Sequence, residues 1–388
     1  MKIVVSGGWS YGNIGDEAIA TATEYLLKRQ FPHAELIFTA YDPEGFEKCH
    51  GIPALPSVHK LLSGAPLPDR DAVLEDPERF GLAPFAELLD ENTLFLMSGG
   101  GYFTESWASQ FTARLAELSI AHSRGAKIAV IGQSIGPVAS SEGRQVLARL
   151  LNTCQFLSVR DRSTQKFLQS LSLRLPVALA PDVANVICDI LPAQPRQELV
   201  NIMPASYSNY VSVERIRRRH PLLEKFQKRL SPAGIRYKLQ MRRLVRKLAQ
   251  QYPIQFVLST HWAWDRKFVD YLCRGLDRNR YTVITAQNTR HLCDSLSRGK
   301  YLISTKMHPI ILSAAYGIRC VAISYNFKVD DYMASLGAEE RCFRIDGVNA
   351  DQMLCALTAS SAGEDSSTLR SQVYGMMARL EKTLECDL

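Results

Sequence analysis

The chain has 388 residues, of which 46% are apolar and 22% charged, and its formal net charge is +7. A chain of this length and composition is expected to be globular, with about two domains that each bury a hydrophobic core. The first apolar run is too short for a signal peptide and no stretch approaches the length of a membrane span, so a secreted or membrane-spanning protein is not expected.

The N-terminal half alternates short apolar runs, typical of buried strands, with amphipathic segments, typical of helices. The predicted strands cover residues 2–6, 34–40, 93–98, 126–132 and 154–160. The predicted helices begin at about Asp16 and further cover residues 107–124, 140–152 and 162–171. This alternation favours a parallel sheet covered by helices on both faces, and the Pro- and Gly-rich stretch 51–84 is expected to be an irregular insertion.

The same alternation begins again after a Pro-containing stretch at residues 189–198. The predicted strands of this half cover residues 199–204, 254–260, 281–285, 301–305 and 319–324, and the predicted helices cover 236–251, 264–276, 289–297, 309–316 and 328–336. We therefore expect an α/β protein of two Rossmann-like, doubly wound domains, residues 1–192 and 193–388, with a cleft at the carboxyl ends of their strands.

Loops that follow the predicted strands of the N-terminal half contain unusual residues, and such loops collect functional groups in parallel sheets. The first loop, "SGGWSYGNIGDEAI" (6–19), has four glycines followed by Asn13, Asp16 and Glu17. Capping of the helix by Asp16 is one interpretation. The glycines favour another, in which the backbone closely approaches a ligand.

Three further loops of this half also carry candidate residues. The segment "LMSGGGYFTESW" (96–107) contains Gly100, Gly101 and Glu105, and "VIGQSIGP" (130–137) contains Gln133 and Ser134. In "SVRDRST" (158–164), Arg160 and Asp161 stand where a strand gives way to a helix. An arginine at such a place more often forms a structural salt bridge than a ligand contact.

The segment "ISTKMHPIILSAAYGI" (303–318) places Lys306, His308 and Pro309 between a predicted strand and a predicted helix. Pro309 suits the first turn of a helix, where its missing N–H is not needed. Lys306 and His308 would then flank the helix N-terminus, whose free N–H groups donate hydrogen bonds to anions. A helix end with a half-buried histidine is the structural interpretation of the same pattern.

The positive charge is concentrated in residues 214–247, which contain thirteen Lys and Arg residues and two Glu residues. The remaining chain has 33 basic and 37 acidic residues. A solvated helical face, an anionic substrate and an anionic membrane surface are all consistent with such a segment. Nucleic-acid binding is not predicted, because no recognised motif or ladder of aromatic residues accompanies the charges.

The nine cysteines include no C-x-x-C pair, and several lie in apolar patterns. Reduced thiols in a cytosolic protein are therefore more consistent with the sequence than disulfides or a zinc site. No spacing of ligands resembles a metal site, so no metal is predicted.

Seven motifs together resemble the polysaccharide pyruvyltransferase family, and they occur in the family's order over residues 6–329. They are "GNIGDEAI", "GGGYF", "GQSIGP", "VRDRST", "APDVA", "TKMHPIILSAAYGI" and "ISYNFKV". The resemblance implies a GT-B-like arrangement of the two domains, with the acceptor on the side of residues 1–192 and the donor on the side of residues 193–388. It also implies transfer of the enolpyruvyl unit of phosphoenolpyruvate to two hydroxyls of a sugar, which forms a cyclic pyruvate ketal and releases phosphate.

The resemblance further implies roles for individual residues. The family's R-x-H donor element corresponds here to Lys306-Met307-His308, and a lysine is a point charge without the two-bond geometry of arginine. Donor contacts are expected from Lys306, His308, Arg160, Pro309 and Lys328, with His308, Arg160 and Lys306 in catalytic roles. The residues expected to bind or orient the acceptor are Asn13, Asp16, Glu17, Gly100, Gly101, Glu105, Gln133 and Ser134.

No cofactor is expected beyond phosphoenolpyruvate as co-substrate, and the acceptor is expected to be a sugar or a lipid-linked glycan. The expected location is the cytoplasm, with peripheral attachment to the inner face of the membrane through residues 214–247 as a further hypothesis. A GT-B-type glycosyltransferase that uses a nucleotide sugar is the alternative enzyme, in which "THWAWD" (260–265) would stack a base. A binding protein that kept the fold without catalysis is the third hypothesis.

Overall fold

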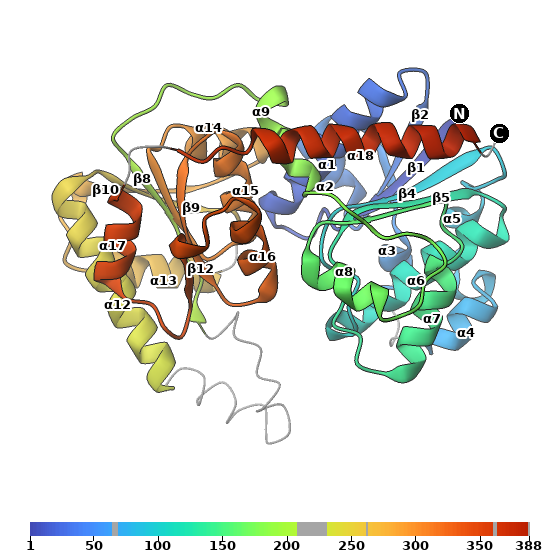
Figure 1. The fold of residues 1–388 in the computed structure, drawn as a ribbon, viewed down its shortest axis with the longest axis horizontal. Coiled ribbons are helices and arrows are strands. Elements are labelled where there is room, and N and C mark those ends of the chain that lie inside the picture. The colour runs from blue at the N-terminus through green and yellow to red at the C-terminus, as the bar shows by residue number, and fades with distance from the viewer. Residues whose placement is uncertain (64–68, 208–230, 261–262, 360–362, 387–388) are drawn as a thin grey trace. The chain divides into compact units, whose positions relative to one another are not determined.

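Each half of the chain folds around a parallel sheet, as the alternation of apolar and amphipathic segments predicts. The computed structural model describes residues 1–63, 69–207, 231–260, 263–359 and 363–386, and its elements are labelled in Figure 1. Unit 1 contains Met1–Val186 and Thr368–Leu388, and unit 2 contains Ile187–Ser367. Among the described residues, no helix is both long enough and apolar enough to cross a bilayer.

The sheet of unit 1 has seven parallel strands in the order β3-β2-β1-β4-β5-β6-β7. The strands are β1 (Lys2–Gly7), β2 (Glu35–Ala40), β3 (Ala54–Pro56), β4 (Thr93–Ser98), β5 (Lys127–Gln133), β6 (Phe156–Val159) and β7 (Ala178–Leu179). Its helices are α1 (Ile14–Gln30), α2 (Pro43–His50), α3 (Val58–Leu61), α4 (Arg70–Glu75), α5 (Ala83–Ala86), α6 (Ala108–Ser123), α7 (Ser141–Leu151), α8 (Arg162–Gln169) and α18 (Ser367–Cys386).

The sheet of unit 2 has six parallel strands in the order β10-β9-β8-β11-β12-β13. The strands are β8 (Val200–Met203), β9 (Ile254–Leu258), β10 (Tyr281–Thr285), β11 (Tyr301–Ser304), β12 (Arg319–Ser324) and β13 (Cys342–Arg344). Its helices are α9 (Ile187–Ile190), α12 (Pro232–Gln251), α13 (Ala263–Cys273), α14 (Thr289–Ser297), α15 (Met307–Ala315), α16 (Phe327–Ser335) and α17 (Ala350–Thr358).

Both sheets follow the strand order of the Rossmann fold, with the first strand of each unit in the middle of its sheet. The direction of winding reverses between β1 and β4 in unit 1, and between β8 and β11 in unit 2. Ligands of open α/β sheets bind at such switch points, outside the carboxyl ends of the strands. The two-domain α/β fold expected from the sequence is confirmed, and the switch points show where to look for a site in each unit.

Continuous apolar runs form the central strands because both faces of these sheets are covered. Every residue of β4 and of β12 is buried, and strands of each sheet contribute to a large hydrophobic core in their unit. Burial at about 25 cal/mol per Å² of apolar surface makes these cores the main stabilising contribution to each unit.

Three details differ from the sequence-based predictions. Residues 51–84 are not an irregular insertion, since they contain the edge strand β3 and the helices α3 and α4. The first helix begins at Ile14, because Asn13 and not Asp16 is its N-cap. The strands β3, β7 and β13 have only two or three residues each, too short to give a clear periodic signal.

The division of the chain also differs from the expected 1–192 and 193–388. The boundary between the units falls at Val186 and Ile187, and the last helix, α18, returns to unit 1. Its contacts there include a hydrogen bond of 3.1 Å from Lys127 Nζ to the Leu384 carbonyl, and the Arg29 guanidinium lies 4.8 Å from the centre of the Tyr374 ring. A boundary placed by a change in sequence pattern cannot detect a terminal helix that crosses back.

Candidate functional site

The switch point of unit 1 brings together residues from the loops after β1 and β4. Asn13 caps α1 by accepting a hydrogen bond from the Gly15 N–H at 3.2 Å, and its Nδ2 donates to Asp16 Oδ2 at 2.9 Å. Tyr102 also donates its hydroxyl to Asp16 Oδ2. Burial and the Asp16 carboxylate raise the pKa of Tyr102 well above its usual value, so the phenol stays protonated. Two of the predicted acceptor residues, Asn13 and Asp16, thus lie together, with Tyr102 as an added partner.

The glycines around this switch point accommodate aromatic side chains of the protein itself. A Cβ on Gly7 would lie 2.1 Å from the Trp9 ring, and a Cβ on Gly8 would lie 2.0 Å from the Tyr102 ring. Gly100 has a φ of +92° and would place a Cβ 3.3 Å from the same Tyr102 ring. The glycines of these two loops therefore let the backbone pass close to Trp9 and Tyr102, which differs from the predicted approach to a ligand.

Glu17 faces away from Asp16 and toward α2. Its Oε1 accepts a hydrogen bond from the Ser10 N–H at 2.7 Å, and its Oε2 lies 2.9 Å from His50 Nε2. The side chains of Glu17 and His50 are only 6% and 4% exposed. Burial lowers the pKa of His50, but hydrogen bonds to Cys49 and Glu17 outweigh it and raise that pKa to about 9. Glu17 is therefore half of a buried ion pair, and neither of these two contacts joins it to another predicted acceptor residue.

This ion pair predicts a pH-dependent stability. The folded-state pKa of His50 is raised above the value of about 6.5 for an unfolded histidine, so the pair stabilises the fold below that pH and the contribution is lost as the pH rises through about 9. Between pH 6.5 and 9.5 we expect wild type to lose on the order of 2 kcal/mol more stability than His50→Gln. Melting temperatures across this range measure the difference, with the exposed His33→Gln as control. Equal losses in wild type and His50→Gln would contradict the pair.

Ser134 and Arg160 form a second group in unit 1, at the ends of β5 and β6. Arg160 Nε donates to Ser134 Oγ at 2.8 Å, and its Nη1 donates to Asp182 Oδ2. Ser134 Oγ in turn donates to Asp161 Oδ2 at 2.6 Å, and Asp161 caps α8. The Arg160 and Asp182 side chains are 3% and 0% exposed. Arg160 is thus held in a buried salt bridge, which favours the structural interpretation over the predicted anion clamp.

The remaining predicted acceptor residues of unit 1 lie apart from Asp16 in their side-chain contacts. Glu105 accepts hydrogen bonds from the Ala139 and Ser140 N–H groups at 2.6 and 3.0 Å. Its partial burial raises the pKa of this carboxyl, but the hydrogen bonds from Ser140 and Ala139 outweigh it and lower that pKa. Gln133 is buried at a register shift between β5 and β6. The backbone of Gly100 accepts from the Ser134 N–H at 2.9 Å, and Gly101 follows it half-buried.

Lys306 lies at the switch point of unit 2, directly after β11, and its ammonium group is paired. Its Nζ lies 2.6 Å from Asp265 Oδ2 and 3.3 Å from Thr260 Oγ1. Thr260 Oγ1 also donates to Asp265 Oδ2 at 3.1 Å. The Lys306 side chain is 11% exposed and that of Asp265 is 0% exposed. The charge expected to meet a donor anion is therefore compensated within unit 2 by a carboxylate of the first turn of α13.

The other predicted donor residues of unit 2 lie in two neighbouring helix starts. Lys306 is the N-cap of α15, and His308 and Pro309 lie in the first turn of that helix, His308 half-buried and Pro309 buried. Lys328 lies in the first turn of α16, where Asn326 caps the helix by accepting from the Lys328 N–H at 3.1 Å. The predicted placement of His308 and Pro309 at a helix N-terminus is confirmed, while their contact with a donor stays a prediction.

Sequence reasoning missed four partners of the candidate residues: Tyr102, His50, Asp182 and Asp265. Three of them belong to motifs or segments that drew attention for another reason, since Tyr102 lies in "GGGYF", Asp182 in "APDVA" and Asp265 in "THWAWD". A lysine that follows a buried strand needs a compensating charge when it is itself buried. This rule indicates that Lys306 has a buried carboxylate as its partner, but it does not say which one.

The fold resembles those of two UDP-GlcNAc 2-epimerases and a glycosyltransferase. The UDP-GlcNAc 2-epimerase of Neisseria meningitidis, bound to UDP-GlcNAc, is 13% identical over 99% of each chain, with a TM-score of 0.59. The UDP-GlcNAc 2-epimerase of Methanocaldococcus jannaschii is 10% identical over 98% of this chain and 99% of its own, with a TM-score of 0.62. A glycosyltransferase from Rickettsia africae is 12% identical over 99% and 98% of the two chains, with a TM-score of 0.56. Identities this low show the fold alone.

The sequence itself identifies the family. A comparison with curated protein sequences gave no match. The family model for polysaccharide pyruvyl transferases matches residues 13–326, which include the loops after β4 and β11. The match runs from Asn13, the cap of α1, to Asn326, the cap of α16. The chain therefore belongs to the polysaccharide pyruvyl transferase family.

Proposed function

We propose that this protein transfers the enolpyruvyl unit of phosphoenolpyruvate to two hydroxyls of one sugar in a glycan. A proton adds to the methylene carbon of the donor, which leaves cationic character at the carbon that carries the phosphate. One sugar hydroxyl attacks this carbon, the C–O bond to phosphate breaks, and the second hydroxyl closes the cyclic ketal. Of the two hydroxyl protons, one replaces the proton given to the methylene carbon and the other leaves with the phosphate.

The observation that carries this proposal is the half-buried His308 in the first turn of α15, within a chain of this family. Histidine is the side chain that exchanges protons near neutral pH, and in this proposal His308 supplies the proton to the methylene carbon. The N–H groups of the first turn of α15 and the positive end of its dipole favour the phosphate of the donor. Lys306 holds the start of the helix in place through Asp265, and it contributes less attraction for the donor than an uncompensated cation would.

In unit 1, Asp16 is the group best placed to receive a sugar hydroxyl. Its carboxylate lies at the switch point, where Asn13 and Tyr102 fix its orientation. Arg160 and Glu105 have structural roles in this proposal, because both are engaged by neighbouring groups of their own unit.

Incubation with phosphoenolpyruvate and a panel of sugar acceptors tests the proposal. The expected result is acceptor-dependent release of phosphate with a matching gain of one pyruvyl ketal in the mass of the acceptor. Thermal shift distinguishes the competing enzymes, because a ligand that binds only the folded protein raises the melting temperature. A rise with a UDP-sugar and none with phosphoenolpyruvate would instead support the glycosyltransferase hypothesis.

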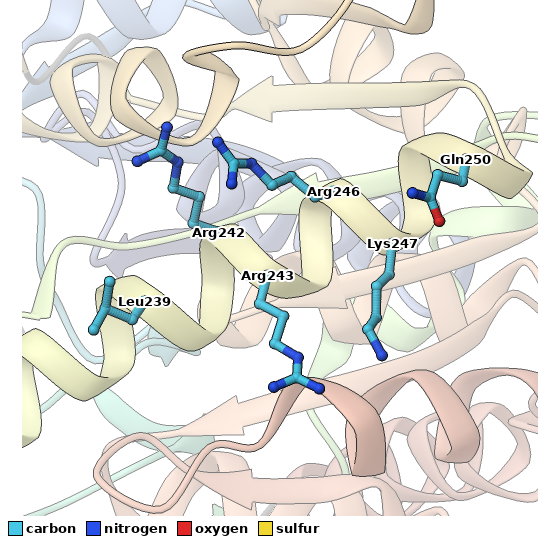
Figure 2. A pocket seen from close by; sticks show the side chains of 6 residues that line it. All are labelled: Leu239, Arg242, Arg243, Arg246, Lys247 and Gln250. Atoms are coloured by element: carbon cyan, nitrogen blue, oxygen red, sulfur yellow. The ribbon is translucent and has the colours of Figure 1, made fainter.

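The proposal extends to attachment at an anionic membrane surface through α12. Of the basic segment, residues 214–230 lie outside the described part of the chain. The C-terminal part of the segment lies on α12, where Arg242, Arg243, Arg246 and Lys247 line a shallow hollow of about 270 Å³. Figure 2 shows these side chains along the helix. Ile235 and Leu239, on the same helix, are 43% and 57% exposed. Basic residues beside exposed apolar ones are typical of helices that lie in a lipid interface.

Vesicle sedimentation tests this attachment. Each well-placed cation contributes about 1 kcal/mol at an anionic surface, so we expect Arg236, Arg242, Arg243 and Arg246 changed together to glutamine to weaken binding at least tenfold. Binding to anionic vesicles should also fall with salt and be weak on neutral vesicles. The matched control changes the exposed Arg266, Arg278, Arg290 and Arg298 of unit 2 to glutamine, with the same loss of charge. Equal binding by both variants, or equal retention on any polyanion, would refute a membrane face on α12.

A further inference from the structure

Three side chains that can each bind a metal ion meet between α1 and α2 of unit 1. Glu17 lies in the first turn of α1, and Cys49 and His50 are the last two residues of α2. A carboxylate oxygen of Glu17, the Sγ of Cys49 and a ring nitrogen of His50 all lie within 4.8 Å of one another. Among the residues that the structure describes, this is the one such group of three ligand side chains. Oxygen, sulfur and nitrogen together form a ligand set that suits a transition metal.

The distances within the group are close to those of a tetrahedral site. A metal held at about 2.0–2.1 Å from nitrogen and oxygen keeps these two ligand atoms about 3.3 Å apart. Glu17 Oε2 and His50 Nε2 are 2.9 Å apart, so a small outward shift of the two side chains makes room for the ion. The side chains of Glu17 and His50 are 6% and 4% exposed, whereas Cys49 is only half-buried. Solvent and a metal ion therefore reach the group from the side of the thiol.

Neighbouring groups hold the ligands in the orientation that a metal requires. Thr21 Oγ1 donates to the Glu17 carbonyl at 3.2 Å and lies 3.4 Å from His50 Nδ1. Because its proton is used for the carbonyl, this oxygen accepts from the ring, and the proton of a neutral His50 sits on Nδ1. The lone pair of Nε2 then faces the group, as in metal sites where a second-shell partner fixes the tautomer. The Ser10 N–H binds Glu17 Oε1 at 2.7 Å and leaves Oε2 for the metal.

The charges of the group fit a divalent cation. The Glu17 carboxylate and a Cys49 thiolate carry two negative charges, which a divalent ion neutralises while His50 binds as the neutral imidazole. Without a metal, protonated His50 compensates the same carboxylate at 2.9 Å. The ion pair of Glu17 and His50 is therefore the metal-free state of this group. Metal binding releases two protons from it, one from the His50 ring and one from the Cys49 thiol.

We propose that Glu17, Cys49 and His50 bind a divalent transition metal such as Zn²⁺, with solvent in the fourth position. Thiolate and imidazole ligands favour Zn²⁺ and Co²⁺ over Mg²⁺ and Ca²⁺, which prefer oxygen ligands. The metal joins the start of α1 to the end of α2, and through the Ser10 N–H it supports the loop after β1. No step of pyruvyl transfer is assigned to the metal, and the inference does not depend on that reaction. Positions 17, 49 and 50 form no spaced motif, so only the fold reveals the site.

Titration of the chelator-treated, full-length protein with Zn²⁺ and Co²⁺ tests the site. Co²⁺ bound by a thiolate gives a charge-transfer band in the ultraviolet, and its visible bands distinguish four-coordinate from six-coordinate metal. We expect one ion per chain, a higher Tm with Zn²⁺, and loss of the charge-transfer band in Cys49→Ser. Loss of a second-shell partner weakens metal binding about tenfold or more, so we expect Thr21→Val, which keeps the shape of the side chain, to do so. Loss of a ligand in His50→Gln should weaken it further.

Matched controls remove the same chemical groups elsewhere. Cys355→Ser and His33→Gln each remove an exposed side chain and should bind both metals as wild type does. Melting temperatures of the metal-free proteins establish that each variant is folded. A folded wild type that binds neither metal overturns the site and leaves Glu17 and His50 as an ion pair alone. A thiolate band that persists in Cys49→Ser, or Zn²⁺ affinity equal in wild type, Cys49→Ser and His50→Gln, also overturns it, because the metal then lies elsewhere.

Discussion

Replacement of His308 with alanine is expected to lower the rate of pyruvyl transfer about a hundredfold or more, the usual scale for a lost general acid. The expectation follows from its position in the first turn of α15, at the edge of the unit 2 sheet where the strand order reverses. The donor phosphate is held by the helix N-terminus in this proposal, so the KM for phosphoenolpyruvate should change much less than kcat.

Steady-state kinetics of phosphate release, with His308→Ala and His308→Gln, measure the effect. The half-buried His291 of α14 provides a control in the same unit, and His291→Ala should keep wild-type turnover. Incorporation of solvent deuterium into the methyl group of the ketal product would add a direct readout of the proton delivered to the methylene carbon. Near-wild-type kcat in a folded His308→Ala protein would remove His308 from the mechanism.

The second large effect concerns stability and involves the pair of Lys306 and Asp265. Replacement of Lys306 with methionine leaves a carboxylate that is 0% exposed without its cation. Removal of one partner of a buried ion pair costs about 3–5 kcal/mol, so we expect Lys306→Met to lower the Tm by roughly 10 °C. This outcome is independent of the donor, because it follows from contacts within unit 2 alone.

A double variant separates charge compensation from a general loss of packing. Lys306→Met combined with Asp265→Leu removes both charges, and well-packed apolar replacements of buried ion pairs are often neutral or stabilising. The double variant should therefore recover most of the lost stability. Lys300→Met breaks the exposed pair with Glu198 at 2.9 Å and should change the stability far less, because solvent screens exposed pairs. A Lys306→Met protein as stable as wild type would show that Asp265 is not buried as a charged group.

The Lys306 contact also changes how the departure from the family's arginine is understood. From sequence, lysine in place of arginine suggests a weaker clamp on the donor. In the structure, the ammonium group faces a carboxylate and a hydroxyl of unit 2 at 2.6 and 3.3 Å. An ammonium is a compact point charge, and it fits this enclosed position where a planar guanidinium would need a wider one. The lysine therefore fits its partner Asp265, and Lys306→Met measures that fit directly.

The sequence by itself determined the central strands of both sheets and most of the helices between them, but not the short strands β3, β7 and β13. Continuous apolar runs such as residues 93–98 and 319–324 correspond to strands with these same bounds, because both faces of the strands are covered and every position favours burial. The helix predicted from Pro309 was likewise close to the observed α15, which begins at Met307, since proline and the following apolar spacing are local signals. The family followed from motifs that are short and local in the same way.

Only the tertiary structure decided which side chains meet. Lys306 and Asp265 are 41 residues apart in the chain, and Tyr102 and Asp16 are 86 apart. The packing of the Tyr11 ring between those of Tyr41 and Tyr102 requires the order of their strands in the sheet, which no local pattern contains. The return of α18 to unit 1 depends in the same way on contacts between the two ends of the chain. The periodicity of a sequence indicates whether each residue will be buried or exposed, but packing between distant segments decides which partner it meets. For this reason the charges on Lys306 and Arg160 could be located from the sequence. Their compensation by Asp265 and Asp182 could not.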